Sequence, residues 1–154
     1  MNWENGGVIA EIASAIGVII TLAYLAHQIA QTNRIAKAAV IRELEEKYID
    51  LYAQIATDTE FATLVTRLRD ANYTAESEVE KEQQYNFAIL LMSIWLCCQV
   101  AYDKGQIDQA TFQIYLDDVE AKLTQWPAIK PYTKQVVESY LTLKDMEIFK
   151  PVLR

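Results

Sequence analysis

The chain has 154 residues, and 14 Lys and Arg against 21 Asp and Glu give a net charge of −7. This length fits one folded domain, so a second globular domain is not expected. Duplex nucleic acids are bound by a basic face that neutralises several phosphates, so the acidic balance argues against nucleic acid as a partner.

The first predicted element is an apolar helix from Val8 to about His27. No residue between Ile12 and Asn33 carries a formal charge, and twenty helical residues span about 30 Å, the thickness of the hydrocarbon core. The helix contains nine Ile, Val or Leu residues, which favour insertion by about 4 kcal/mol in total, while Glu11 lies near one end, where an acid costs less. We therefore predict a transmembrane anchor over residues 1–33 and a helical domain over residues 34–154.

The charges that flank this helix predict its orientation. Arg34, Lys37 and Arg42 follow it, whereas Glu4 and Glu11 lie at its start. Lys and Arg concentrate on the cytoplasmic flank of membrane helices, so we expect a bacterial inner-membrane protein with its N-terminus outside and the bulk of the chain in the cytoplasm. The acidic start also argues against a cleavable signal peptide.

Two sets of side chains on the anchor predict what it contacts. Trp3 and Tyr24 are aromatic residues near its two ends, and together with Arg34 and Lys37 they are expected at the membrane interface. Small residues recur every four positions, which lets a second membrane helix pack closely. These small residues are Gly6, Ala10 and Ser14, then Ala13, Gly17 and Thr21. The expected partners are membrane lipid and either other membrane-protein subunits or a second copy. The alternative is that residues 8–26 form the core helix of a soluble oligomer.

Helices are also predicted beyond the anchor, because no Gly or Pro falls between Val18 and Lys104. An apolar seam with steps of three and four residues predicts that the first helix continues to about Ala56. The seam consists of Ile41, Leu44, Tyr48, Leu51 and Ile55. Thr57 and Glu60 have the spacing of a capping box, which predicts a second helix from about Asp58 to Asp70.

A third helix is expected to start at Thr74 or Ser77 and to end near Asp103, where Lys104-Gly105 is a stop signal. It carries two apolar seams, so we expect it to be covered on both sides. One seam is Phe87, Leu90, Ile94, Cys97 and Ala101, and the other is Tyr85, Ile89, Met92, Leu96 and Val100. Because residues 85–102 are uncharged, a second membrane span is the alternative. It would place the later lysines outside, against the charge bias, so we favour the central helix of a bundle.

The last predicted helices complete a cytoplasmic bundle of about four to five helices. Asp108 is the expected N-cap of a fourth helix, with Ile107 and Phe112 as a hydrophobic staple, and Trp126-Pro127 ends it. Its inward residues are Phe112, Tyr115, Leu116, Val119 and Leu123. A final helix is expected over about Pro131–Lys144, followed by an irregular tail. It should direct Val136, Val137, Tyr140 and Leu143 toward the bundle.

The start of the chain resembles a group of short proteobacterial proteins without an assigned activity. The resemblance rests on Met-Asn-Trp at 1–3, Ala10-Glu11-Ile12, and Tyr24-Leu25-Ala26 followed by Gln28-Ile29, with a weaker likeness at Gly105-Gln-Ile-Asp108. It implies one N-terminal membrane helix with a helical remainder, and it implies no reaction.

Few residues suggest chemistry. His27 is the one histidine, and at the end of a membrane helix it could ligate a haem-type metal if two chains met. Cys97 and Cys98 are expected to be small core residues, because their neighbours are apolar. The acidic residues Glu43, Glu45, Glu46 and Asp50 and the pair Asp117-Asp118 are expected on solvated helix faces. No metal site and no catalytic set can be assembled from these residues.

We therefore expect a non-enzymatic structural or interaction protein without a cofactor, an accessory or scaffold subunit of a membrane complex or a homo-oligomer. Two alternatives remain open. One is a membrane-tethered ligand-binding or signalling module, and the other is a redox or pigment subunit that binds its cofactor through His27.

Overall fold

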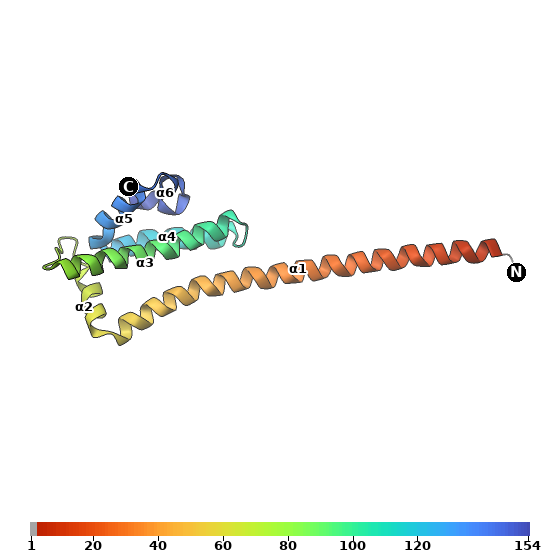
Figure 1. Ribbon diagram of the computed structural model, residues 1–154, viewed down its shortest axis with the longest axis horizontal. Helices are drawn as coiled ribbons and strands as arrows, with labels where there is room; N and C mark the ends of the chain where they lie inside the picture. The colour runs from red at the N-terminus through yellow and green to blue at the C-terminus, as the bar shows by residue number, and fades with distance from the viewer. Residues whose placement is uncertain (1–2) are drawn as a thin grey trace. The chain divides into compact units, whose positions relative to one another are not determined.

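The computed structural model describes the backbone of residues 3–154 and the side chains of residues 11–154. Over this range the chain is all-helical, as the sequence predicts (Figure 1). It contains seven α-helices and no strand. The α-helices are α1 (Trp3–Thr57), α2 (Thr59–Arg67), α3 (Glu78–Asp103), α4 (Gln109–Gln125), α5 (Lys130–Ser139), α6 (Leu141–Asp145) and α7 (Lys150–Leu153), with short 3₁₀ helices η1 (Pro127–Ile129) and η2 (Glu147–Phe149). Residues 1–39 and 40–154 form two compact units, and α1 contributes to both.

The predicted end of the first helix, near Ala56, is confirmed, because α1 ends at Thr57. The predicted seam is confirmed as well. Leu44 and Leu51 are buried in the core of the second unit, and Ile41, Tyr48 and Ile55 pack against that core. The spacing of three and four residues thus correctly identifies the face of α1 that is covered.

The cap of α2 differs from the predicted capping box. Asp58, not Thr57, is the N-cap, and its Oδ1 accepts hydrogen bonds from the backbone N–H groups of Glu60 at 2.9 Å and Phe61 at 3.0 Å. The Thr57 hydroxyl instead donates to the carbonyl of Ala53 at 2.8 Å. The prediction that Thr57 caps α2 is therefore wrong, because the adjacent carboxylate satisfies two free amides. The helix also ends at Arg67 rather than Asp70.

The ends of α3 agree with prediction, but its buried face does not. Ser77 is the N-cap, and Gly105 follows the helix with a φ of +66°, which suits glycine. The most buried line runs between the two predicted seams, so Leu90, Cys97 and Val100 are exposed. The buried residues are Gln84, Phe87, Ala88, Leu91, Met92, Ile94, Trp95, Cys98, Gln99 and Ala101. One broad face is covered, not two opposite seams.

Helix α4 lies antiparallel beside α3 and matches its prediction (Figure 1). The Asp108 carboxylate accepts a hydrogen bond from the Thr111 N–H at 2.8 Å, and Ile107 and Phe112 are buried as the staple requires. Trp126 is the C-cap. The side chains expected inward are buried, apart from Leu116, which is half-buried.

The C-terminal prediction is wrong at two points. The expected helix over Pro131–Lys144 is interrupted at Tyr140, whose backbone is extended and whose side chain is 59% exposed, contrary to its expected inward position. The expected irregular tail is η2 and α7, with Ile148, Phe149 and Val152 buried in the core.

Two buried glutamines on α3 explain why the tail is ordered. The Gln99 Oε1 accepts a hydrogen bond from the backbone N–H of Ile148 at 3.0 Å, and the Gln84 Nε2 donates to the carbonyl of Ala128 at 2.9 Å. Buried backbone groups outside regular helices must find partners, and these two side chains supply them at η2 and η1. The irregular segments can therefore lie against α3 at low cost.

The cap at α2 gives a test of local stability. Asp58→Ala removes an acceptor from two amides and should cost about 1 kcal/mol, which lowers the melting temperature by about 2–4 °C. Thr57→Ala is the matched control and should change the melting temperature less, because its hydroxyl caps no N-terminal amide. Tryptophan fluorescence of the full chain in mild detergent, reporting Trp95 and Trp126, follows the transition. Equal effects of the two variants would contradict the assignment of Asp58.

Candidate functional site

The most unusual surface of the chain is the exposed apolar stretch of α1 in the first unit. Within the described residues, an 18-residue window of α1 has a mean hydropathy of 1.8, and none of that window is buried in the protein. Nine large side chains of residues 12–29 are each between 48% and 65% exposed: Ile12, Ile16, Val18, Ile19, Ile20, Leu22, Tyr24, Leu25 and Ile29. Such a continuous apolar surface is rare on a protein that meets only water, and it marks a site of contact.

The small residues predicted to pack against another helix lie on this stretch. Ala13, Ser14, Gly17 and Thr21 are exposed, and a Cβ added at Gly17 would meet nothing within 4 Å. The Thr21 hydroxyl donates to the carbonyl of Gly17 at 2.8 Å, so this polar group has a partner inside its own helix. The surroundings of Gly6 and Ala10 lie outside the described part of the structure. The structure therefore leaves the described part of the small-residue face open.

The predicted interface residues are exposed where the structure describes them. The Tyr24 hydroxyl accepts a hydrogen bond from Gln28 Nε2 at 2.7 Å, and Arg34 and Lys37 are exposed. The side chain of Trp3 lies outside the described residues. His27 is exposed, and no group of three His, Cys, Asp or Glu side chains that could hold a metal ion occurs within the described part of the chain.

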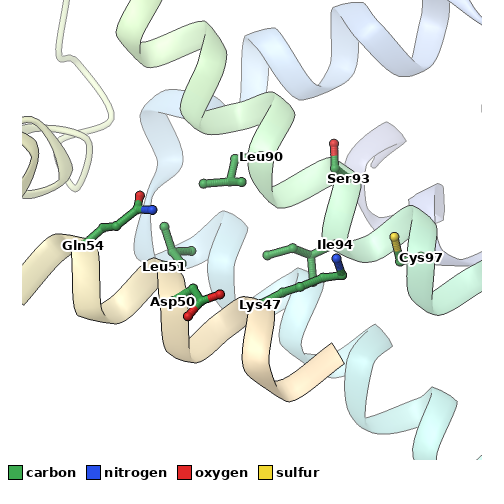
Figure 2. A pocket seen from close by; sticks show the side chains of 8 residues that line it. All are labelled: Lys47, Asp50, Leu51, Gln54, Leu90, Ser93, Ile94 and Cys97. Atoms are coloured by element: carbon green, nitrogen blue, oxygen red, sulfur yellow. The ribbon is translucent and has the colours of Figure 1, made fainter. Parts of the chain in front are cut away.

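A groove of about 280 Å³ lies between α1 and α3 in the second unit (Figure 2). The apolar side chains of Leu51, Leu90 and Ile94 lie between the two helices, and polar groups surround them. The polar and thiol side chains are Lys47, Asp50, Gln54, Ser93 and Cys97. These groups can donate and accept hydrogen bonds, and they offer no histidine base.

A second groove of about 280 Å³ borders the other side of α3. Ile89, Met92 and Leu96 of α3 line it together with residues of α5 and α6, and its lining is largely apolar. The other lining residues are Val136 of α5, Tyr140 between α5 and α6, Thr142 and Leu143 of α6, and Phe149 of η2. Ser93 lies on the edge of both grooves. The exposed side of α3 is thus a ridge with a groove along each flank.

The two adjacent cysteines have different environments. Cys98 is buried, and burial raises the pKa of its thiol to about 12, which suppresses the reactive thiolate. Cys97 is exposed, so the prediction that both are core residues is wrong for Cys97. Neighbouring helix positions differ by 100°, which separates them when only one face is covered.

A lysine enclosed by aromatic rings connects α1 to α4. Lys122 Nζ lies 5.9 Å from the ring centroid of Tyr48, 5.2 Å from that of Tyr52 and 5.4 Å from that of Trp126. It also lies 3.5 Å from Asp118 Oδ1 and donates to the Tyr52 hydroxyl. The side chain of Lys122 is only 11% exposed. Cation–π and ion-pair contacts together hold this ammonium group at the surface of the core.

The same cluster shifts two pKa values upward. Burial alone would lower the pKa of Lys122, but its hydrogen bond to Tyr52 and the charge of Asp118 outweigh burial. Burial raises the pKa of Tyr48 well above its usual range, and the hydrogen bond that its hydroxyl donates to Asp118 Oδ2 at 2.7 Å adds to this effect. Both the protonated lysine and the neutral tyrosine are therefore favoured by folding.

This cluster is not predicted from the sequence, and the prediction that Asp118 lies on a solvated face is wrong. Asp118 is half-buried beside Tyr48, whereas Asp117 is exposed. One signal was available, because Asp118 and Lys122 are four residues apart on a helix, a spacing that brings their side chains together. The pairing with α1 could not be derived, since it joins residues 70 positions apart.

Comparison of the chain with models of known protein families, with curated proteins and with solved structures gives no match.

The buried phenols predict a loss of stability at high pH. Burial raises the pKa of Tyr115 to about 12, whereas an unfolded tyrosine ionises near pH 10. Above that pH the unfolded chain releases a proton that the folded chain retains, so the free energy of unfolding falls. The expected contribution of Tyr115 is about 1 kcal/mol for each pH unit between 10 and 12. Tyr48 and Lys122, whose pKa values are also raised, shift stability in the same direction.

Urea unfolding of the full chain in mild detergent between pH 8 and 11.5 tests this prediction. Tyr115→Phe removes only the hydroxyl, for which no hydrogen bond is present in the described structure, and should reduce the loss of stability above about pH 10. A variant that loses stability as steeply as the unmodified chain would contradict the assignment.

Proposed function

We propose that the chain is a non-enzymatic, membrane-anchored interaction protein, with residues 8–27 in lipid and the helical bundle on the cytoplasmic side. The observation that carries the proposal is the exposed apolar stretch of α1, of which no part of the 18-residue window is buried in the protein. Full burial of one large aliphatic side chain stabilises a protein by about 1.5–3 kcal/mol. A lipid bilayer supplies that burial at once for the seven large aliphatic side chains of residues 12–25.

Charge placement supports one orientation. The span has no formal charge from Ile12 to Asn33, and Arg34 and Lys37 follow directly. Both basic side chains are exposed and free to reach lipid headgroups. Because Lys and Arg concentrate on the cytoplasmic flank, the proposed orientation is N-terminus outside and bundle inside, in a bacterial inner membrane.

Helix α3 is proposed as part of the bundle rather than as a second span. By length and composition α3 could also cross a membrane, because an 18-residue window of it has a mean hydropathy of 1.5. Half of that window, however, is buried inside the protein. Its buried residues include Gln84 and Gln99, whose side-chain amides form hydrogen bonds with backbone groups of Ala128 and Ile148. These contacts give α3 a role that lipid could not replace, which supports a single-pass arrangement.

An interaction role suits the surfaces better than ligand binding does. Pockets for small molecules usually enclose about 300–1,000 Å³, and the two grooves beside α3, at about 280 Å³ each, are as small as the smallest of these. A cofactor subunit using His27 has less support, because this histidine is exposed and no metal-binding group of side chains accompanies it in the described residues. We therefore assign the chain to the accessory or scaffold class, associating through the small-residue face of α1, through the bundle, or through both.

Membrane insertion can be tested by adding charge to the proposed span. Each lysine near the bilayer centre costs about 2.5–3.5 kcal/mol, so Ile19→Lys with Leu22→Lys should outweigh the gain of about 4 kcal/mol from the apolar residues. The unmodified chain should remain with the membrane after carbonate extraction, and the double variant should be released. Ile49→Lys with Ile114→Lys is the matched control, because these exposed isoleucines belong to the second unit. Release of the unmodified chain would refute the anchor.

Orientation can be tested with two reporter cysteines in a Cys97→Ser background, in which the remaining Cys98 is buried. A cysteine in place of Ile114, which is 67% exposed, should react with a membrane-impermeant maleimide in inverted vesicles and not in intact cells. A cysteine in place of Asn5 should show the reverse pattern. Labelling of the Ile114 reporter in intact cells would overturn the proposed orientation.

A further inference from the structure

The outer side of α3 is an uncharged strip that the rest of the described structure leaves partly exposed. No residue from Tyr85 to Tyr102 carries a charge, although Leu90 is 39% and Val100 is 36% exposed. The exposed or half-buried positions facing outward are Asn86, Ile89, Leu90, Ser93, Leu96, Cys97 and Val100, and we call them the α3 strip. The Ser93 hydroxyl donates to the carbonyl of Ile89 at 2.8 Å, so it is satisfied without water.

The α3 strip is symmetric about Ser93. Counted from this residue, its members lie at offsets of three, four and seven positions in both directions. The symmetry extends to charge at the two ends, because Glu82 lies eleven residues before Ser93 and Lys104 lies eleven residues after it. Both side chains are exposed. In a two-fold interface a contact of residue i with residue j is repeated as a contact of j with i, and an antiparallel pair centred on Ser93 brings the oppositely charged ends of the strip together.

We propose that the α3 strip binds the α3 strip of a second copy of this chain, antiparallel and with Ser93 on the two-fold axis. Glu82 then faces Lys104 of the second copy at both ends of the contact, whereas a parallel pair would place Glu82 against Glu82. The grooves on the flanks of α3 receive the side chains of the opposing helix, as ridges pack into grooves. The inference deepens the proposed function, on which it rests, by naming the partner of the bundle.

The size of the surface fits a weak dimer. The fifteen helical residues from Asn86 to Val100 extend about 22 Å, and a contact about two helix diameters wide measures about 20 Å across. This footprint corresponds to about 900 Å² buried in total, in the range of weak interfaces. Confinement of both copies to one membrane would raise their effective concentration.

A lipid surface is a poorer occupant of the α3 strip than a second copy. Helices that lie on membranes carry Lys and Arg on their polar flank, which attract anionic headgroups. The first turns of α3 instead carry Glu78, Glu80 and Glu82, with Lys81 already paired to Glu78 at 2.7 Å. The acidic end of the strip would be repelled by an anionic leaflet.

Disulfide trapping of the full chain in native membranes tests the geometry. In a Ser93→Cys, Cys97→Ser variant the two introduced thiols meet at the axis, so a mild oxidant should give a disulfide-linked dimer. The unmodified chain is the matched control. Its two Cys97 residues would be eight positions apart along the pair, about 12 Å, and a disulfide needs Cα atoms within about 7 Å. Cross-linking of the unmodified chain as strongly as the variant would indicate a parallel pair and overturn the proposal.

A charge swap separates the interface from a folding defect. Glu82→Lys or Lys104→Glu alone, in the Ser93→Cys, Cys97→Ser background, should reduce cross-linking several-fold, and the two substitutions together should restore it. Failure of the double swap to restore cross-linking, or absence of cross-linking in every variant, would overturn the proposal. If vesicles protect Cys97 of the unmodified chain from maleimide and no variant cross-links, the strip faces lipid. That result would also overturn the proposal. Carbonate extraction of the same membranes reports the anchor separately, so the two proposals can fail independently.

Discussion

Burial of one face of α3 is the constraint on which the bundle depends. The side chains of Ala88, Leu91, Trp95 and Cys98 are completely buried along its centre, and α4, α5, η1 and η2 all contact this helix. Apolar burial supplies most of the favourable free energy of such a core, but it is not directional. The position of each segment is fixed instead by hydrogen bonds from the two buried glutamines, which hold η1 and η2 through their backbone groups. The short C-terminal helices are ordered because α3 supplies both the apolar surface and these polar partners.

Helix α1 combines two kinds of surface in one continuous element. From Ile12 to Ile35 its apolar side chains occupy all sides and remain exposed, which is the pattern of a helix surrounded by apolar material. From Ile41 onward most of the apolar residues form one seam, which is covered, while Ile49 and Tyr52 lie off the seam and remain exposed. The change in pattern lies close to the division of the two units after Ala39. One secondary-structure element can therefore serve two environments, because helix formation requires only local hydrogen bonds while burial is decided by side chains.

The cluster around Lys122 shows how charge is used at the edge of this core. Three aromatic rings and Asp118 surround the ammonium group, and α1 contributes two of the rings. An enclosed charge is costly unless it is paired, so the cluster is stabilising only while α1 and α4 stay together. It complements the nonspecific burial of the seam with a contact that only one register of α1 can make. On the flank away from Lys122, α1 forms the groove with α3. Leu90, Ser93 and Cys97 line this groove and also belong to the α3 strip.

The sequence by itself determined the helices and most of their ends, because these depend on local chemistry: the absence of Gly and Pro, the caps at Ser77 and Asp108, the stop at Gly105 and the period of the seam on α1. It also determined the apolar stretch of α1, which needs only a count of charges. Tertiary structure alone decided which line of α3 is buried, since its two seams were equally apolar in sequence. It likewise decided that Cys97 is exposed, that Asp118 joins Tyr48 and Lys122, and that the tail is ordered. Each of these outcomes depends on side chains from distant parts of the chain, and short-range periodicity carries no information about which distant segment supplies the cover.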